Sequence, residues 1–378
     1  MARFTVIYSI LAADLDEARR KAFDICVEQT VEFPYDLIPD EFIRAEIVGR
    51  IESLEETQPG RYRTEITYHE DTAGVEFTQF LNVVFGNTSI KPGVRVESLH
   101  PTETQLAAFS GPRFGVDGLR QLTGVTGRAL LCSALKPMGL DTEALAEMAY
   151  RFALGGIDII KDDHGLADQR YAPFEERVTR CAQAVQRANR ETGGNCLYLP
   201  NVTADAGKTR QRARFAREAS AGAVIISGAL TGFDTLREVA QDDAIGLPVF
   251  FHPAFAGSFT VVPDAGLSHY ALYGQLVRMA GADAAIFPNF GGRFSFSLQE
   301  CASIADGCRS TMGSLKPAFP APGGGMTFDN VRQMVTFYGP DAVFLIGGGL
   351  FRYDPDITKG VRDLRMIVEQ EYAVAQAI

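Results

Sequence analysis

The sequence predicts an α/β protein in which a (β/α)8 TIM barrel follows a small ferredoxin-like α+β domain. Apolar, β-branched runs recur from about residue 129 onward, and a stretch of helical length follows each run. This alternation is typical of parallel strands joined by crossover helices. Eight strand and helix pairs can be counted, and eight pairs over about 250 residues have the size of a closed barrel.

The candidate barrel strands are short and regularly spaced. They begin near residues 129, 156, 196, 223, 247, 284, 316 and 342. Segments between them, such as LDTEALAEMAYRFAL after the first strand, repeat apolar residues every three or four positions, as amphipathic helices do. We therefore expect residues 111–378 to form the barrel domain and to carry the active site.

The first 110 residues show a different pattern. We expect strands near 3–11, 62–69 and 75–84, and a helix over LDEARRKAFDICVEQ. Turn residues separate these elements, and the order is typical of a split βαβ domain. Residues 1–110 are therefore predicted to form the ferredoxin-like domain, with 111–119 as the connection.

Composition and charge exclude several functional classes. The chain is 22% charged and 46% hydrophobic, as folded globular proteins are. Its net charge is -11 without any basic block, which disfavours nucleic acid as a partner. No window holds the roughly 18 apolar residues that a membrane crossing requires. Six scattered cysteines without a CxxC pair indicate buried free thiols, so we expect a cytoplasmic protein.

Polar side chains and glycines follow most of the predicted barrel strands. Catalytic groups of TIM barrels lie at the carboxyl ends of the strands, which share one mouth. The residues at these positions are Lys136, Lys161, Asp162, Asp163, His164, Asn201, His252, Asn289, Gly291, Gly292, Arg293 and the triplets 323–325 and 347–349.

The second strand ends in four ionisable residues, Lys161 to His164, after the apolar run IDII. Such charges are costly near a barrel core unless they pair or hold a metal. A solvated charge run is the alternative. The position after a strand, beside Lys136 of the neighbouring strand, favours a metal site or a general base.

The two glycine triplets predict a phosphate site. Backbone amides without side chains can approach a phosphate closely, and barrels often bind phosphate after the seventh and eighth strands. The candidate contacts are Gly324, Gly325, Gly347 and Gly348, with ordinary tight turns as the alternative. No G-x-G-x-x-G follows the first strand, so a dinucleotide site is not indicated.

His252 and Arg293 are two further candidates. His252 ends the fifth strand and is either a site residue or a hydrogen-bonded core histidine. Arg293 lies in the loop NFGGRFSF after the sixth strand. A glycine-rich loop of this kind can close over a substrate and bring a cation to it, while a surface arginine is the alternative.

Several of these segments together resemble the RuBisCO large-subunit family. They are ALKPMGL at 134–140, GGIDIIKDDHG at 155–165, LTGF at 230–233 and the two glycine triplets, in the family's order and spacing. The resemblance runs from about Glu28 to the end of the eighth strand. It is more similar to the RuBisCO-like proteins, the form IV branch, than to true carboxylases.

The resemblance implies roles for the residues of the second strand. Lys161 matches a lysine that takes up carbon dioxide as a carbamate, and Asp163 matches a carboxylate ligand of magnesium. The carbamate adds a hard oxygen ligand suited to magnesium. His164 stands where the family has a glutamate ligand. The site therefore binds magnesium weakly, accepts another divalent ion, or uses His164 in acid-base work.

Other matches extend the expected site. Lys136 matches a lysine that moves protons during enolisation, and Arg293 replaces a lysine of a mobile loop. Glu28 matches a glutamate of the amino-terminal domain near the active site. In the family this domain covers the barrel mouth of a second subunit, so a homodimer with the active site at its interface is expected.

The resemblance also implies a substrate with a single phosphate. His252 matches one phosphate-site histidine, but Pro253 replaces the arginine after it, and Ile286 stands where a second histidine is expected. Met138 stands where carboxylases have a second lysine. The glycine-lined phosphate site is retained while the opposite one has lost its cations, so productive carbon dioxide fixation is not expected.

The implied activity is that of an isomerase or lyase acting on a phosphorylated ketose through a metal-stabilised enediolate. Isomerisation of 5-methylthioribulose 1-phosphate or a similar sugar monophosphate is the leading hypothesis. The alternatives are a decarboxylase of a phosphorylated 3-oxo sugar acid, such as 3-oxo-isoapionate 4-phosphate, a methionine-salvage enolase, and a catalytically silent binding protein. Asn87 counts against the enolase, because that branch has a lysine base there.

Overall fold

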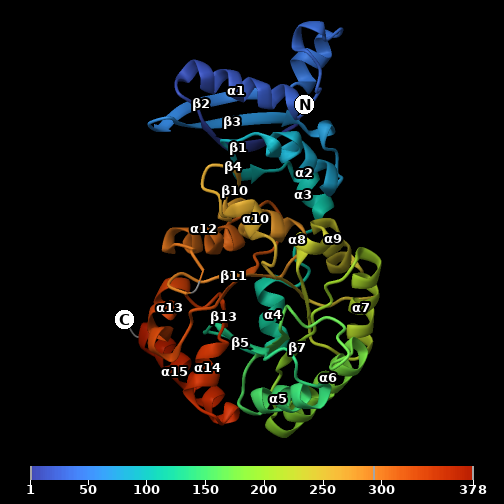
Figure 1. Ribbon diagram of the computed structural model, residues 1–378, viewed down its shortest axis with the longest axis vertical. Helices are drawn as coiled ribbons and strands as arrows, with labels where there is room; N and C mark the ends of the chain where they lie inside the picture. The colour runs from blue at the N-terminus through green and yellow to red at the C-terminus, as the bar shows by residue number, and fades with distance from the viewer. Residues whose placement is uncertain (1, 293, 377–378) are drawn as a thin grey trace.

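The computed structural model describes residues 2–292 and 294–376. Figure 1 shows a sheet domain stacked on a barrel along the long axis of the molecule. The barrel is a nearly closed ring of eight parallel strands surrounded by helices, so the predicted (β/α)8 barrel and the smaller amino-terminal sheet domain are confirmed.

The amino-terminal domain has ferredoxin-like topology. Its elements are β1 (Arg3–Leu11), α1 (Leu15–Glu28), β2 (Arg50–Gln58), β3 (Arg61–His69), α2 (Phe77–Phe85), β4 (Val94–His100) and α3 (Glu103–Phe109). The strands form an antiparallel sheet in the order β4-β1-β3-β2. With this order, the helical connections through α1 and α2 lie on one face of the sheet. A two-residue strand from the barrel segment, β10 (Gly266–Leu267), adds to the sheet beside β4.

The strand expected near 75–84 is wrong, because this segment forms helix α2. Its buried residues Phe77, Phe80, Val83 and Val84 are three or four positions apart, which is helical spacing. Aromatic and β-branched residues favour strands locally, but packing on the sheet decided the outcome. Strands β2 and β4 were not predicted, and β2 is mostly exposed, so it carries little apolar alternation.

The barrel strands occupy the predicted positions. They are β5 (Leu130–Leu135), β6 (Ile159–Asp162), β7 (Leu197–Leu199), β8 (Val224–Ile226), β9 (Val249–Phe251), β11 (Ala284–Pro288), β12 (Phe319–Gly323) and β13 (Val343–Leu345). The ladder runs β7-β6-β5-β13-β12-β11-β9-β8. Between β7 and β8 the ring is completed by a bridge from Asn201 to Ile225 and by the bond from Val202 N to Ile225 O at 3.1 Å.

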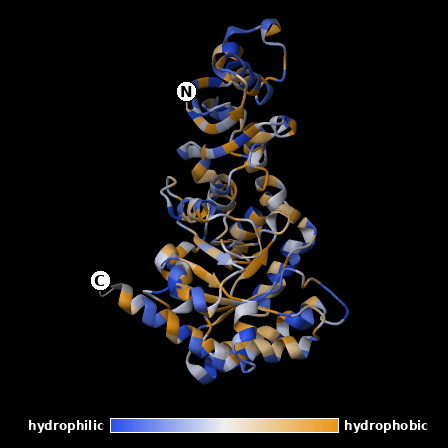
Figure 2. Ribbon diagram, turned by 60° about the vertical axis from the view of Figure 1, so that its left-hand side comes forward, coloured by the Kyte–Doolittle hydropathy of each residue, from blue (hydrophilic) through white to orange (hydrophobic). Residues whose placement is uncertain are grey.

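Most of the helices in the barrel domain cover the outside of the strands, whereas α4 (Gly115–Thr123) lies across one end of the ring (Figure 1). The others are α5 (Thr142–Leu154), α6 (Phe174–Thr192), α7 (Ala206–Glu218), α8 (Gly228–Thr231), α9 (Phe233–Gln241), α10 (Gly257–Thr260), α11 (Val277–Met279), α12 (Leu298–Arg309), α13 (Val331–Tyr338), α14 (Gly348–Tyr353) and α15 (Ile357–Gln376), with a π-helix at Tyr270–Leu276. Figure 2 shows apolar strands at the centre and mixed polarity on the helices. No helix in the described ranges is long and apolar enough to span a membrane.

Helix α4 closes one end of the barrel. Val116 and Leu119 belong to the same buried cluster as the side chains inside the ring, among them Leu130 and Ile159. Asp283 fixes the start of this helix by accepting hydrogen bonds from the backbone of Phe114 and Gly115, each at 2.7 Å. The opposite end, where the strands have their carboxyl termini, is left as the mouth.

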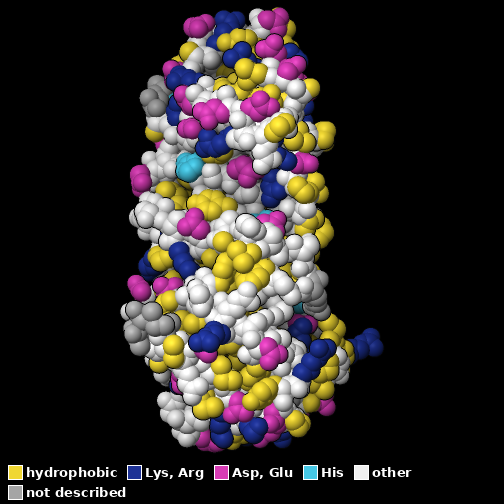
Figure 3. All heavy atoms as spheres, turned by 90° about the vertical axis from the view of Figure 1, so that its left-hand side faces the viewer, with side chains coloured by type: hydrophobic (Ala, Val, Ile, Leu, Met, Phe, Trp, Pro, Cys, Tyr) yellow, Lys and Arg dark blue, Asp and Glu magenta, His cyan; other side chains and the backbone are white. Residues whose placement is uncertain are grey.

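Two expectations from composition concern the whole molecule. All six cysteines are free and buried, as the sequence predicted. Figure 3 shows acidic and basic side chains interspersed over one face, and the face drawn there has no extended basic patch. This distribution agrees with the acidic net charge of -11.

Candidate active site

Strand alternation separates the charged residues at the end of β6 into two groups. Ile159 packs inside the barrel, so Lys161 and Asp163, at even spacing from it, are expected on the same inner side. Ile160 packs in the outer layer against the helices, and Asp162 shares its parity. The chain therefore directs one lysine and one carboxylate to the mouth and a second carboxylate to the helix layer.

Asp163 lies between the side chains of Lys136 and His164 at the mouth. Its Oδ1 lies 2.9 Å from Lys136 Nζ of the β5 end and 3.4 Å from His164 Nδ1. Burial alone raises the pKa of Asp163, but its hydrogen bonds with His164 and Lys136 outweigh burial and hold the pKa well below its usual range. Asp163 is therefore ionised and available as an anionic ligand or as the partner of Lys136.

Lys161 is almost completely buried, with 2% of its surface exposed. Its Nζ donates a hydrogen bond to the backbone oxygen of Asp162 at 2.9 Å. Burial lowers the pKa of Lys161, because the charged ammonium loses its water without gaining a directly paired carboxylate. A larger share of neutral amine makes this lysine a better nucleophile toward carbon dioxide.

The two histidines at the mouth lie face to face. The rings of His164 and His252 are stacked, with centroids 4.4 Å apart and planes 13° apart. Burial, with the nearby charges of Lys161 and His164, lowers the pKa of His252 to about 2, so its ring is neutral. His252 Nδ1 accepts a hydrogen bond from Ala254 N at 3.1 Å, so the proton of the neutral ring is on Nε2. His252 is thus both hydrogen-bonded and part of the mouth.

Asp162 forms the support beneath the site. Its buried carboxylate accepts hydrogen bonds from Arg177 Nε at 3.1 Å, from Tyr198 OH at 2.8 Å and from Asn201 N at 3.0 Å. Asn201 Nδ2 then donates to the backbone oxygens of His164 and Leu166, both at 2.9 Å. This network fixes the backbone on which Lys161 and Asp163 are carried.

Arg177 and Tyr198 of this network were missed by sequence reasoning. Arg177 lies on α6, and its side chain in the ion pair with Asp162 is fully buried. The only sequence signal was indirect, because two adjacent carboxylates on a strand must face opposite sides, and the outer one then needs a cationic partner.

The glycine triplets border open space at the ends of β12 and β13. A Cβ built on Gly324, Gly347 or Gly348 would meet no atom within 4 Å, so their backbone is accessible. A Cβ on Gly325 would lie 2.5 Å from the Cα of Gly292, which requires glycine where the two loops meet. This geometry permits a small anion to approach the backbone, and the phosphate contact itself stays a prediction.

One predicted site residue, Glu28, is not brought to the mouth of its own chain. Glu28 ends α1 at the far end of the molecule from the barrel (Figure 1). There it accepts a hydrogen bond from Asn87 at 3.0 Å, lies 3.6 Å from Lys91 Nζ, and borders a hollow of about 370 Å³. Arg293 lies outside the described residues.

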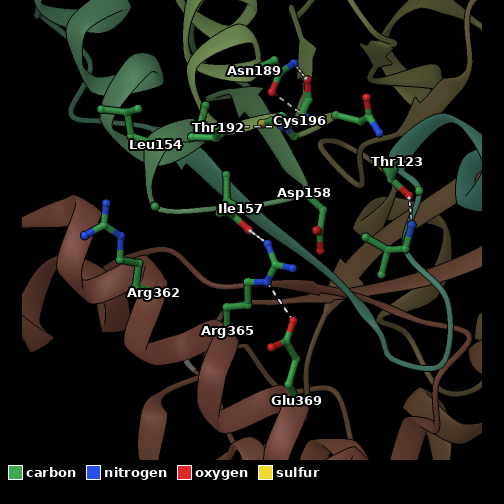
Figure 4. A pocket seen from close by; sticks show the side chains of 18 of the residues that line it. Thr123, Leu154, Ile157, Asp158, Asn189, Thr192, Cys196, Arg362, Arg365 and Glu369 are labelled. Carbon is green, nitrogen blue, oxygen red and sulfur yellow. Dashed lines mark hydrogen bonds and ion pairs between the residues drawn. The ribbon is translucent and has the colours of Figure 1, made fainter.

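A larger hollow of about 490 Å³ lies at the other end of the barrel, where β6 and β7 begin (Figure 4). Three of its four charged lining residues, Asp158, Arg365 and Glu369, already have partners. Asp158 binds Arg128 at 2.6 and 2.9 Å, and Arg365 lies between the backbone oxygen of Gly156 at 3.4 Å and Glu369 at 2.8 Å. Because these contacts tie α15 to the barrel strands, we assign the hollow a structural role.

Asp163 and His164 by themselves offer a divalent cation few protein ligands at the mouth. In the described ranges no three His, Cys, Asp or Glu side chains converge as a metal site requires. Asp163 and His164 supply one carboxylate and one imidazole. A carbamate on the buried Lys161 amine would add the missing oxygen ligand, so the residues fit the cation and the carbamate together.

A family model, related sequences and solved structures similar to this chain all point to one family. The family described as ribulose bisphosphate carboxylase large chain, catalytic domain, matches residues 115–293. The chain is 39% identical over 357 residues to ribulose bisphosphate carboxylase-like protein 1 of Rhodopseudomonas palustris, covering 94% of this chain and 95% of that protein. A crystal structure of a Rubisco-like protein from Rhodopseudomonas palustris superposes with a TM-score of 0.88 at 38% identity, covering 98% of both chains.

Two relatives carry names that state a reaction. The chain is 39% identical over 344 residues to 5-methylthioribulose-1-phosphate isomerase of Rhodospirillum rubrum, covering 91% of this chain and 90% of that one. It is 31% identical over 378 residues to 2,3-diketo-5-methylthiopentyl-1-phosphate enolase of Bacillus pumilus, covering 98% and 93%.

Proposed function

The chain belongs to the RuBisCO large-subunit family, and from this premise we propose that it is a RuBisCO-like isomerase of 5-methylthioribulose 1-phosphate or a similar sugar monophosphate. The observation that carries the proposal is the pairing of Lys136 with Asp163 at 2.9 Å beside the buried Lys161. This arrangement offers a proton-transfer group next to a candidate cation site. The similarity to the Rhodospirillum rubrum isomerase supports the choice of substrate.

In this proposal Lys161, Asp163 and His164 hold a divalent cation, magnesium or a more nitrogen-tolerant ion. Lys161 contributes as a carbamate formed with carbon dioxide. The cation supplies positive charge where an enolate oxygen develops. Asp163 fits this role because it is ionised, and the Asp162 network keeps the strand that carries it in place.

The protons are moved by the chain's own side chains. In this proposal Lys136 acts as the neutral amine, takes a proton from the carbon beside the substrate carbonyl and becomes an ammonium. A proton then returns to another carbon of the same substrate, which restores the amine. The side chain of Lys136 is 39% exposed and can reach into the mouth. His164 is the alternative proton-transfer group if it does not ligate the cation, and the ring of His252 stacks on it at 4.4 Å.

The remaining contacts complete the proposed site. Gly324, Gly325, Gly347 and Gly348 bind the single phosphate through their backbone. Glu28 lies too far from the mouth of its own chain to take part there. In this proposal it reaches the mouth of a second subunit in a homodimer. Arg293 is the predicted cation of the loop after β11.

Incubation with ketose monophosphates in deuterium oxide, with and without magnesium, tests the proposal. We expect deuterium exchange and an isomerised product without loss of carbon. Release of carbon dioxide from a phosphorylated 3-oxo sugar acid would instead identify the decarboxylase. Absence of exchange with every sugar would leave a binding protein and contradict the proposal.

Replacing Lys136 with glutamine should lower kcat by about 10²–10⁴-fold, the usual contribution of a general acid or base. Glutamine keeps a hydrogen bond to Asp163 but cannot accept and release the proton. Deuterium exchange into the substrate measures the defect directly. An unchanged exchange rate in the Lys136→Gln variant would contradict the assigned role.

Replacing His164 with glutamate should shift the metal preference toward magnesium. A carboxylate oxygen suits this hard cation better than an imidazole nitrogen, so we expect the magnesium concentration for half-maximal activity to fall by about tenfold or more. Titration with magnesium and with manganese measures the shift. If His164→Glu lowers kcat and leaves both titrations unchanged, His164 acts on protons and is not a ligand.

A further inference from the structure

The turn after β9 presents an exposed aromatic side chain three residues after His252. The bond from Ala256 N to Pro253 O at 3.0 Å closes this turn. Phe255, its third residue, is 64% exposed and has a φ of +69°. Left-handed backbone at this position of a turn normally favours glycine, because a side chain makes it strained.

Folding alone does not account for Phe255. A buried phenyl ring would compensate for the strained backbone, but most of this ring is exposed to solvent. Strained residues of this kind cluster at ligand sites, where the side chain is needed in one place. The side chain therefore needs a contact that the isolated chain does not supply.

The turn lies at the edge of the mouth. His252, three residues before Phe255, stacks on His164 with ring centroids 4.4 Å apart. Strand β9 is separated from β12 by β11 alone, so the turn is two strands away from the glycine triplet 323–325. Two strand spacings are roughly 10 Å, a length that a sugar phosphate can span.

The chemistry of this edge is apolar. The segment PAFAGSFTVV, residues 253–262, contains no ionisable side chain. It offers no cation that could hold a phosphate. The side chain that it exposes nearest to His252 is a phenyl ring, which packs well against aliphatic groups and against the sulfur of a thioether.

We propose that Phe255 contacts the unphosphorylated end of the substrate and selects substrates that carry an alkylthio group there. The proposal rests on the proposed function for the sugar phosphate scaffold. It goes further by naming the residue that distinguishes an apolar end from a hydroxyl. Phe255 is thus a specificity residue and takes no part in proton transfer.

Binding of two unreactive probes by the full-length protein tests this proposal by calorimetry. The probes are 5-methylthioribitol 1-phosphate and ribitol 1-phosphate, which has a hydroxyl in place of the methylthio group. We expect the wild-type protein to bind the methylthio probe at least about tenfold more tightly, the selectivity that a small apolar group provides. In Phe255→Ala the ratio should fall close to one, with the affinity for ribitol 1-phosphate unchanged.

Two further variants separate the specificity role from folding. Phe259→Ala removes another exposed phenyl ring of the same segment, 38% exposed, and should keep the wild-type ratio. Phe255→Gly also removes the side chain, but glycine adopts the positive φ without strain. This variant should therefore bind the two probes with similar affinity, while its Tm stays equal to or above the wild-type value.

Three results would overturn the proposal. They are a wild-type protein that does not prefer the methylthio probe, a Phe255→Ala variant that keeps the preference, and an equal loss of affinity for both probes accompanied by a change in oligomeric state. Because binding is measured without turnover, failure of the isomerase assignment shows up separately as absence of deuterium exchange. If Phe255→Ala loses the preference for the methylthio probe, that result would then still support the specificity role.

Discussion

Replacing Lys161 with alanine should lower kcat by about 10³-fold or more, because the site loses the charge stabilisation that a bound divalent cation provides. The remaining donors, Asp163 and His164, are too few to hold a cation alone. In labelled bicarbonate we expect the wild-type protein to give a carbamate resonance by ¹³C NMR, and the Lys161→Ala variant should lack it. Activity and the NMR signal are measured on the same samples, with and without magnesium.

Lys208→Ala is the matched control, since Lys208 is an exposed lysine at the start of α7. It should retain both the activity and the wild-type NMR spectrum. A Lys161→Ala protein with full, magnesium-dependent activity would exclude the carbamate. Loss of activity without any carbamate signal in the wild-type protein would assign Lys161 a direct role as an amine.

Replacing Arg177 with methionine should lower the free energy of unfolding by about 3–5 kcal/mol, the usual effect of removing one partner from a buried ion pair. Asp162 would keep its hydrogen bonds from Tyr198 and Asn201 but would lose its countercharge. Urea denaturation followed by circular dichroism measures the change. Because Asp162 supports the strand that carries Lys161, the folded fraction should also lose activity.

Arg180→Met provides the control on the same helix. Arg180 is exposed, so its replacement should change stability by less than about 0.5 kcal/mol. The double variant Arg177→Met with Asp162→Leu should recover part of the lost stability, since it removes the unpaired charge. A double variant that is as unstable as Arg177→Met would show that the loss comes from packing of the arginine side chain.

The parts of the fold that follow from local periodicity could be predicted from the sequence. The barrel strands were found because each is a short apolar run followed by a helical pattern. The ionisable run at the end of β6 was singled out in the same way, whereas the structure shows which of its residues face the mouth. The segment containing Phe77 and Phe80 was assigned to a strand because its residue types favour strands, whereas its spacing of three and four is helical. Spacing was the better guide there.

Contacts that depend on tertiary structure could not be predicted in this way. The partner of Asp162 is an arginine fifteen positions later on a different element, and nothing local identifies it. The positive φ of Phe255 belongs to a turn with no glycine at this position, so no local sequence signal indicated it. The position of Glu28 away from the mouth of its own chain appears only once both domains are placed (Figure 1).

The strand Gly266–Leu267 makes the division of the chain into two parts less simple than the residue numbers suggest. It leaves the barrel segment, pairs with β4 and returns, and Arg61 of the first domain also forms an ion pair with Asp264 just before it. A fragment ending at residue 110 would lack β10 and would leave the edge of β4 unpaired. A fragment starting at residue 111 would contain β10 without the strand that it pairs with. Separate expression of the halves should therefore yield material prone to self-association, whereas co-expression allows the missing strand to be supplied in trans.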